Sequence, residues 1–158
     1  MTDRELILDT LRRMGKSIAA DLQTRSSGMT GTEINAEDDY IPDFAEAVKK
    51  ENMRNRKAGQ TDGFVCKSTE GRVVRLIQNY DSDVYTAEPE ELPAQWRFVW
   101  STDPEKALPF ISLSTSPYAN GDCCTFDGFV WRSGQDGNVW EPGTTNVKWE
   151  KVSALVEG

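Results

Sequence analysis

The chain has 158 residues, which is enough for one ordinary domain or two very small ones. It carries 26 acidic and 18 basic residues, a formal net charge of −8 and no histidine. This balance argues against a surface that follows nucleic-acid phosphates, an anionic membrane surface or a polyanionic wall polymer. Neutral ligands or protein partners fit the charge better.

Residues 3–25 are expected to form a helix, because apolar side chains recur along them at helical spacing. They are Ile7, Leu11, Met14, Ile18 and Leu22, and their spacing is close to a coiled-coil heptad. A helix of this length is marginal alone in water, so the stripe must pack on something. Two partners are open: the chain's own β region, or copies of the same helix in a homo-oligomer such as a trimer. Residues 1–27 are therefore assigned to this helix, with oligomerisation as one of its two open roles.

Targeting signals and metal sites are not expected. No stretch is apolar and long enough to span a bilayer, and the first residues, MTDRELILD, lack the apolar core of a signal peptide. We expect synthesis in the cytoplasm without a signal peptide. Three cysteines, Cys66, Cys123 and Cys124, have no C-x-x-C spacing. They are expected to be buried, reduced thiols on strands rather than metal ligands.

Residues 28–58 are expected to be a linker with one short helix. The stretch SSGMTGTEIN, residues 26–35, is rich in turn formers. Pro42 can open a helix, and residues 45–55 can continue it. From residue 60 onward, short β-type runs alternate with Gly, Asp, Asn and Pro, so this part is expected to be strands and turns.

The β region contains one pattern twice. The first copy begins GRVVRLIQNYDSDVYTAEPEELPAQWRFV at Gly71, and the second begins GFVWRSGQDGNVWEPGTTNVKWEKV at Gly128. With two short insertions in the first copy, the matching residues are Gly71 and Gly128, Val73 and Val130, Arg75 and Arg132, Gln78 and Gln135, Asp81 and Asp136, Val84 and Val139, Tyr85 and Trp140, Glu88-Pro89 and Glu141-Pro142, Trp96 and Trp149, and Val99 and Val152. The repeat predicts one small β module in two copies, at 59–100 and 116–153, joined by a connector at 101–115. The expected fold class is α+β, with an N-terminal helix before two small tandem antiparallel β modules.

Each module is expected to be a hairpin covered by a returning segment. A sheet of two or three short strands buries little, so one large indole can supply much of its core. The expected structural core consists of Trp96, Trp149, Pro89 and Pro142, and the two prolines are also expected to redirect the chain. The repeated arginines, Arg75 and Arg132, are expected to pair with the repeated acids, Glu88 and Glu141.

The second copy resembles the small chitin-binding modules of bacterial chitinases and cellulases, the carbohydrate-binding families five and twelve. The residues that match their pattern are Tyr118, Gly121, Asp122, Cys124, Gly128, Trp131, Pro142 and Trp149. The first copy follows this pattern poorly. Where the family has adjacent sugar-binding aromatics after the second strand, this chain has RSGQ, so that ligand face does not carry over.

The layout of the whole chain is similar to that of small structural proteins of phages and prophages of Gram-positive gut bacteria. An N-terminal helix is followed by a joint, here GTEI at 31–34 and IPDF at 41–44, and then by β repeats. This resemblance implies a virion component at the tail or on a fibre, with a role in host adsorption and with other virion proteins as partners.

Two aromatic residues are the leading candidates for stacking on a sugar ring. Tyr85 and Trp140 each follow a polar D-x-[DN]-V loop, where a large aromatic has little reason to be buried. Stacking on a neutral glycan and packing between the two modules both remain open for this pair. Trp131 and Tyr80 are weaker candidates, and hydrogen bonds are expected from Asp136 and Asn138, with Asp81 and Asp83 in the first copy.

Nothing in the sequence indicates catalysis or a cofactor. There is no histidine, no nucleophile elbow and no phosphate-binding glycine loop. The expected function is a non-enzymatic virion protein, located in the virion, whose β modules bind host-surface glycan. The alternative is a virion docking or decoration protein that binds no sugar.

Overall fold

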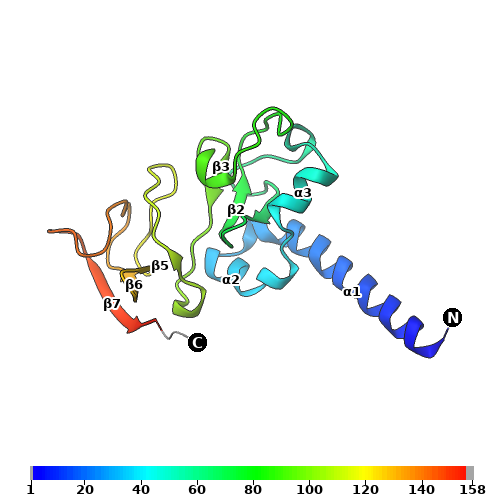
Figure 1. Cartoon of the computed structure of the whole chain (residues 1–158), viewed down its shortest axis with the longest axis horizontal. Coiled ribbons are helices and arrows are strands. Elements are labelled where there is room, and N and C mark those ends of the chain that lie inside the picture. The colour runs from blue at the N-terminus through cyan, green and yellow to red at the C-terminus, as the bar shows by residue number, and fades with distance from the viewer. Residues whose placement is uncertain (1, 156–158) are drawn as a thin grey trace.

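A long N-terminal helix precedes two small β-sheets, which confirms the α+β class (Figure 1). The computed structural model describes residues 2–155. The first sheet has the order β1-β2-β3, formed by Val65–Lys67, Val73–Leu76 and Trp96–Phe98, and all its pairs are antiparallel. The second has the order β4-β5-β6-β7, formed by Leu108–Pro109, Cys123–Phe126, Phe129–Ser133 and Trp149–Ala154. It is not wholly antiparallel, because β4 runs parallel to β5.

Helix α1 (Asp3–Arg25) begins with a capping box, in which Thr2 and Glu5 satisfy each other's backbone N–H groups. Its last turns dock on the first sheet, where Leu22 is fully buried. The Gln23 side chain pairs with edge strand β1 as a neighbouring strand would: its Nε2 donates to the Val65 carbonyl at 2.7 Å, and its Oε1 accepts from the Val65 N–H at 2.9 Å. The first turns of α1 project away from both sheets (Figure 1).

The segment predicted to be a linker contributes to the first core. It forms α2 (Gly31–Ala36) and α3 (Phe44–Lys50), with single 3-10 turns at Ser26–Gly28, Asp38–Tyr40 and Met53–Asn55. Ile34, Ile41, Phe44, Ala47 and Met53 are all buried here. The first module therefore includes residues well before position 59. The later 3-10 turns are Pro89–Glu91 and Pro104–Lys106.

The strand registers of the two modules agree with the sequence repeat. Cys66 lies opposite Val74 in one module, and Cys124 lies opposite Trp131 in the other. Leu76 lies opposite Trp96, and at the matching position Ser133 lies opposite Trp149. Both hairpins turn on a glycine with positive φ, Gly71 at 90° and Gly128 at 82°. The expectation of two copies of one β unit matches these registers.

Each module also has a parallel segment that the repeat did not reveal. Asp43 bridges to Lys67 in β1, and Pro109 pairs with Thr125 at the matching place in β5. The next residue in each case is a phenylalanine that meets the module's tryptophan edge-on. Phe44 lies 5.7 Å from Trp96 and Phe110 lies 6.1 Å from Trp149, both at 89° between ring planes. The structural repeat is therefore longer than the sequence repeat.

The two core tryptophans differ in burial. Trp96 has 0% of its surface exposed, and its indole Nε1 donates to the buried Tyr80 hydroxyl at 3.1 Å. Trp149 is only partly buried, so the prediction of an equivalent core role is met less fully in the second module. Pro89 and Pro142 are both buried, as expected.

The modules are joined by a stack of aromatic rings. Trp100, after β3, stacks on Tyr118 of the second module with ring centroids 4.4 Å apart and planes 14° apart. Phe98 continues the stack on one side and Phe110 on the other, at 5.6 Å and 5.5 Å. Rings in such contact bury large apolar areas and fix the relative placement of the modules.

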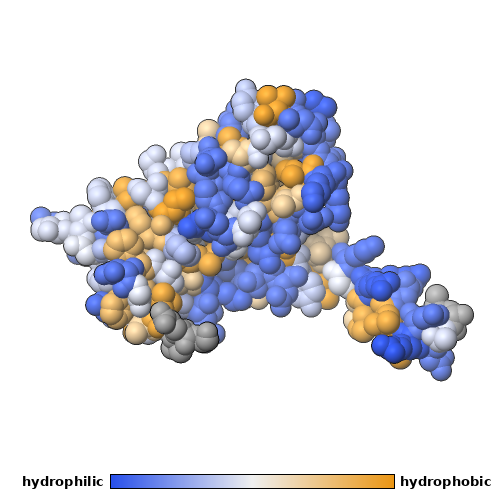
Figure 2. Space-filling model, in the orientation of Figure 1, coloured by the Kyte–Doolittle hydropathy of each residue, from blue (hydrophilic) through white to orange (hydrophobic). Residues whose placement is uncertain are grey.

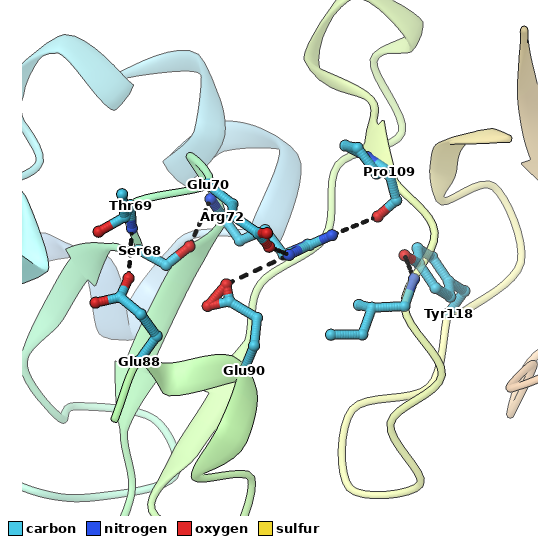
Figure 3. Close-up of polar contacts among 9 residues, drawn as sticks. Ser68, Thr69, Glu70, Arg72, Glu88, Glu90, Pro109 and Tyr118 are labelled. Atoms are coloured by element: carbon cyan, nitrogen blue, oxygen red, sulfur yellow. Dashed lines mark hydrogen bonds and ion pairs between the residues drawn. The ribbon is translucent and has the colours of Figure 1, made fainter. Parts of the chain in front are cut away.

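A buried arginine adds a polar link between the sheets (Figure 3). Arg72 is 4% exposed, and its guanidinium lies between the carboxylates of Glu70 and Glu90. Its second terminal nitrogen donates to the Pro109 carbonyl in β4 at 2.7 Å. Arg72 immediately precedes β2, so one side chain connects the two sheets.

The predicted pairing of Arg75 with Glu88 is wrong. Arg75 is buried and donates to neutral oxygens, the carbonyls of Ser26, Thr61 and Gly63 and the Ser26 hydroxyl. The Glu88 carboxylate instead accepts from the Thr69 backbone N–H at 2.8 Å. Arg75 provides donors for carbonyls that the 3-10 turn Ser26–Gly28 and the loop before β1 leave without strand partners.

The three cysteines are free and buried, as predicted, with Cys66 on β1 and Cys123 and Cys124 on β5. Burial raises the pKa of all three thiols, that of Cys124 to about 12. Only the thiolate is a strong nucleophile, so these groups are expected to be inert in the folded protein at neutral pH.

Ellman's reagent at pH 8 is therefore expected to label no cysteine in the folded protein and all three after denaturation. The same shifts predict a stability trend. Above about pH 8.5 an unfolded chain loses thiol protons that the folded protein keeps, so the free energy of unfolding falls as pH rises. Rapid labelling of the folded protein would contradict the buried placement, and urea unfolding at pH 7, 8.5 and 10 would check the trend.

Candidate functional site

Tyr85 and Trp140 occupy matching positions and are both on the surface. Tyr85 is 60% exposed and Trp140 is 48% exposed. The contact between the modules is made by other rings, Trp100 and Tyr118. Packing of this pair between the modules, which the sequence left open, is therefore excluded. Both rings are therefore open to contact with a ligand.

The backbone of Trp140 is held from several directions. Its N–H donates to the Asn138 side-chain Oδ1 at 3.3 Å, and its carbonyl accepts from the Trp149 indole Nε1 at 2.8 Å. The preceding carbonyl, of Val139, accepts from the Ser112 hydroxyl at 2.7 Å. A loop fixed in this way presents an exposed ring with little conformational entropy left to lose on binding.

The indole N–H of Trp140 is also unusual. The chain has five tryptophans. The other four indole N–H groups donate to a protein oxygen, on Tyr80, Ser116, Phe126 and Trp140. Within residues 2–155 that of Trp140 alone has no such acceptor. Trp140 therefore offers both a ring face and a hydrogen-bond donor to a ligand.

The Tyr85 loop is organised by Asp81. The Asp81 carboxylate accepts from the Asn52 amide at 2.8 Å and from the Asp83 backbone N–H at 3.0 Å, and these bonds lower the pKa of Asp81. The Tyr85 N–H donates to the Asp81 carbonyl at 2.9 Å. Asp81 thus shapes the loop from within, and Tyr85 is held by fewer contacts than Trp140.

Two of the predicted sugar-binding residues are not accessible. Tyr80 is 8% exposed and accepts the Trp96 hydrogen bond in the first core. Asn138 is 0% exposed, and its amide donates to the Ser133 hydroxyl. Both predictions are wrong, because a polar residue in a loop can serve as an internal hydrogen-bonding group of that loop.

The remaining two candidates stay on the surface. Asp136 is exposed, and its Oδ1 accepts from the Asn120 backbone N–H at 2.9 Å. Trp131 is partly buried; its Nε1 donates to the Phe126 carbonyl, and the Lys151 ammonium lies 5.2 Å from its ring centroid. A cation already near this ring makes Trp131 a poorer stacking surface than Trp140.

A groove lies elsewhere, beside the free edge of β3. It has a volume of about 690 Å³, and Arg75, Arg97, Trp100 and Asp122 are among its lining residues. None of the predicted sugar-binding residues lines it. Sequence reasoning missed it because it forms where the 3-10 turn Ser26–Gly28, β3 and the loop before β5 meet.

Comparisons of the chain with protein-family models, with curated proteins and with solved structures give no match. Among the described residues, no group of three or more His, Cys, Asp or Glu side chains is arranged to hold a metal ion. No helix in the same part of the chain has the length and apolarity needed to cross a bilayer.

Proposed function

We propose that the protein is a non-enzymatic binding protein whose second β module holds a neutral glycan on Trp140. The observation that carries this proposal is the exposed indole on an immobilised loop, with its N–H free of protein acceptors within residues 2–155. The apolar C–H face of a sugar ring packs on such an aromatic surface, and sugar hydroxyls accept from the indole N–H.

Charge supports a neutral ligand. The chain has a net charge of −8, and the exposed acids Asp136 and Glu141 lie near Trp140 in sequence. Carboxylates can accept hydrogen bonds from sugar hydroxyls but repel anionic polymers. Tyr85 is a second and weaker site of the same kind in the first module.

The virion setting rests on the resemblance of the layout to phage and prophage structural proteins. In that setting the modules face outward and act in adsorption to the host surface. The alternative keeps the virion role without sugar binding, with Trp140 and Tyr85 as contacts to another virion protein. The exposure of both rings is compatible with either partner, so the ligand has to be tested directly.

Titration with neutral oligosaccharides, including chitin fragments, is expected to change the tryptophan fluorescence of the protein. Trp140→Ala should weaken binding at least about tenfold, or about 1.4 kcal/mol, while the melting temperature stays unchanged because the ring is exposed. Tyr85→Ala should have a smaller effect of the same kind. Isothermal titration calorimetry gives both affinities.

Tyr40→Ala is the matched control, because Tyr40 is a 40% exposed aromatic in the helical segment and belongs to neither loop. It should leave sugar binding unchanged. No response to any glycan, with intact folding of every variant, would favour the docking alternative.

A further inference from the structure

The projecting part of α1 exposes a row of apolar side chains. Leu6, Ile7, Leu8, Leu11 and Met14 are between 43% and 60% exposed. They form an apolar patch on the helix end that stands clear of the body (Figure 2). A 23-residue helix whose outer turns have no partner is marginal in water, so this patch favours an additional contact.

The spacing of the patch fits a second copy of the same helix running in the opposite direction. Ile7, Leu11, Met14 and Ile18 follow the alternating spacing of a coiled-coil seam. If the twofold axis passes between residues 12 and 13, Ile7 of one helix meets Ile18 of the other and Leu11 meets Met14. All four seam residues then find an apolar partner.

Charges at the two ends of the seam distinguish the antiparallel arrangement from a parallel one. The seam positions beyond Ile7 and Ile18 are held by Arg4 and Asp21. In the antiparallel pair, Arg4 of one copy faces Asp21 of the other at both ends. In a parallel dimer or trimer, Arg4 would face Arg4 and Asp21 would face Asp21, and like charges in a seam are unfavourable.

The body of the molecule leaves this face open. The last turns of α1 dock through Leu22 and Gln23. The Asp21 side chain is 62% exposed; its Oδ2 accepts from Arg25 Nε at 2.6 Å, and its other carboxylate oxygen is left for Arg4 of the second copy. Ile18 is only partly buried. We propose that the protein forms an antiparallel dimer through α1, independently of any glycan. The trimer that the sequence left open would be parallel and would place the like charges together.

Multi-angle light scattering on the full chain is expected to give twice the 17.7 kDa of one chain. Leu11→Asp should raise the dissociation constant about 100-fold or more, because it places two carboxylates in the seam. Leu11 is 57% exposed in the single chain, so the variant should unfold at the melting temperature of the wild-type monomer. Thr10→Asp, on the flank of the seam, is the matched control and should still dimerise.

Orientation is tested by mixing charge variants. Arg4→Asp and Asp21→Arg should each weaken self-association, by about tenfold, because each pairs like charges. An equimolar mixture of the two should restore the wild-type affinity, since both ends then carry opposite charges. In a parallel pair each single variant would only exchange one pair of like charges for another and leave the affinity unchanged, and the mixture would associate more tightly than the wild type. A monomeric wild type at 100 μM would overturn the proposal. So would a trimer, or a mixture no tighter than the separate variants.

Discussion

Trp96→Ala is expected to lower the free energy of unfolding by about 3–5 kcal/mol. The ring is wholly buried, contacts Phe44 and Tyr80 edge-on, and lies opposite Leu76 in a sheet of only three short strands. Its loss leaves a cavity at the centre of the first core and also removes the donor to the buried Tyr80 hydroxyl. Urea unfolding followed by circular dichroism measures the change.

Trp149→Ala provides the comparison within the same molecule. Trp149 occupies the matching strand position but is partly exposed, so its removal should cost roughly half as much, because less area leaves water on folding. It should also loosen the Trp140 loop, whose carbonyl it holds. Equal losses for the two substitutions would contradict the difference in burial on which this expectation rests.

Arg72→Ala is expected to destabilise the protein by about 3–5 kcal/mol, because it leaves a buried carboxylate without its cation. The Glu90 side chain is 11% exposed and its Oε2 lies 3.3 Å from Arg72. The substitution also removes the hydrogen bond to Pro109 that joins the sheets. Chemical unfolding gives the free energy, and limited proteolysis within residues 101–107 reports on the loosened connector.

The double variant Arg72→Met with Glu90→Leu separates the two effects. Replacing both charges by apolar groups removes the desolvation cost together with the attraction, so most of the stability should return. The link to Pro109 stays broken, and proteolysis should remain faster than in the wild type. A loss of less than about 1 kcal/mol in the free energy of unfolding for Arg72→Ala alone would contradict the prediction, because the Arg72–Glu90 pair would then contribute no more than an exposed ion pair.

The repeated half of the fold was predictable because both modules carry the same pattern of strand residues and glycine turns. The glycine turns, the strand registers and the positions of Trp96 and Trp149 all follow from two aligned copies. The polar loops made Tyr85 and Trp140 candidates for the surface, but the sequence left packing between the modules open, and only the structure shows that both rings are exposed. In each case a local pattern agreed with the tertiary structure.

The contacts that the sequence did not predict join residues from outside the repeat. The parallel pairing at Asp43 is a single bridge, which is too short to leave a periodic signal. Tyr80 lies in an insertion that only the first copy has. Its hydroxyl is buried where it accepts a hydrogen bond from the Trp96 indole, and the sequence does not show this contact. The sequence around Asn138 is typical of a surface loop. In the structure the backbone of Asn138 pairs with that of Tyr118, and the residue is buried.

The upstream position of Phe44 and Phe110 restricts how one module could be exchanged for another. Phe44 and Phe110 come from upstream of the hairpins they support, so a module cannot be exchanged by recombination at the borders of the visible repeat. A shuffled gene segment that starts at residue 59 or 116 would encode a sheet whose indole keeps its tyrosine neighbour but has lost its phenylalanine neighbour. The complete structural unit is therefore the hairpin together with the stretch that pairs with it from upstream, residues 41–100 for one copy and 107–154 for the other.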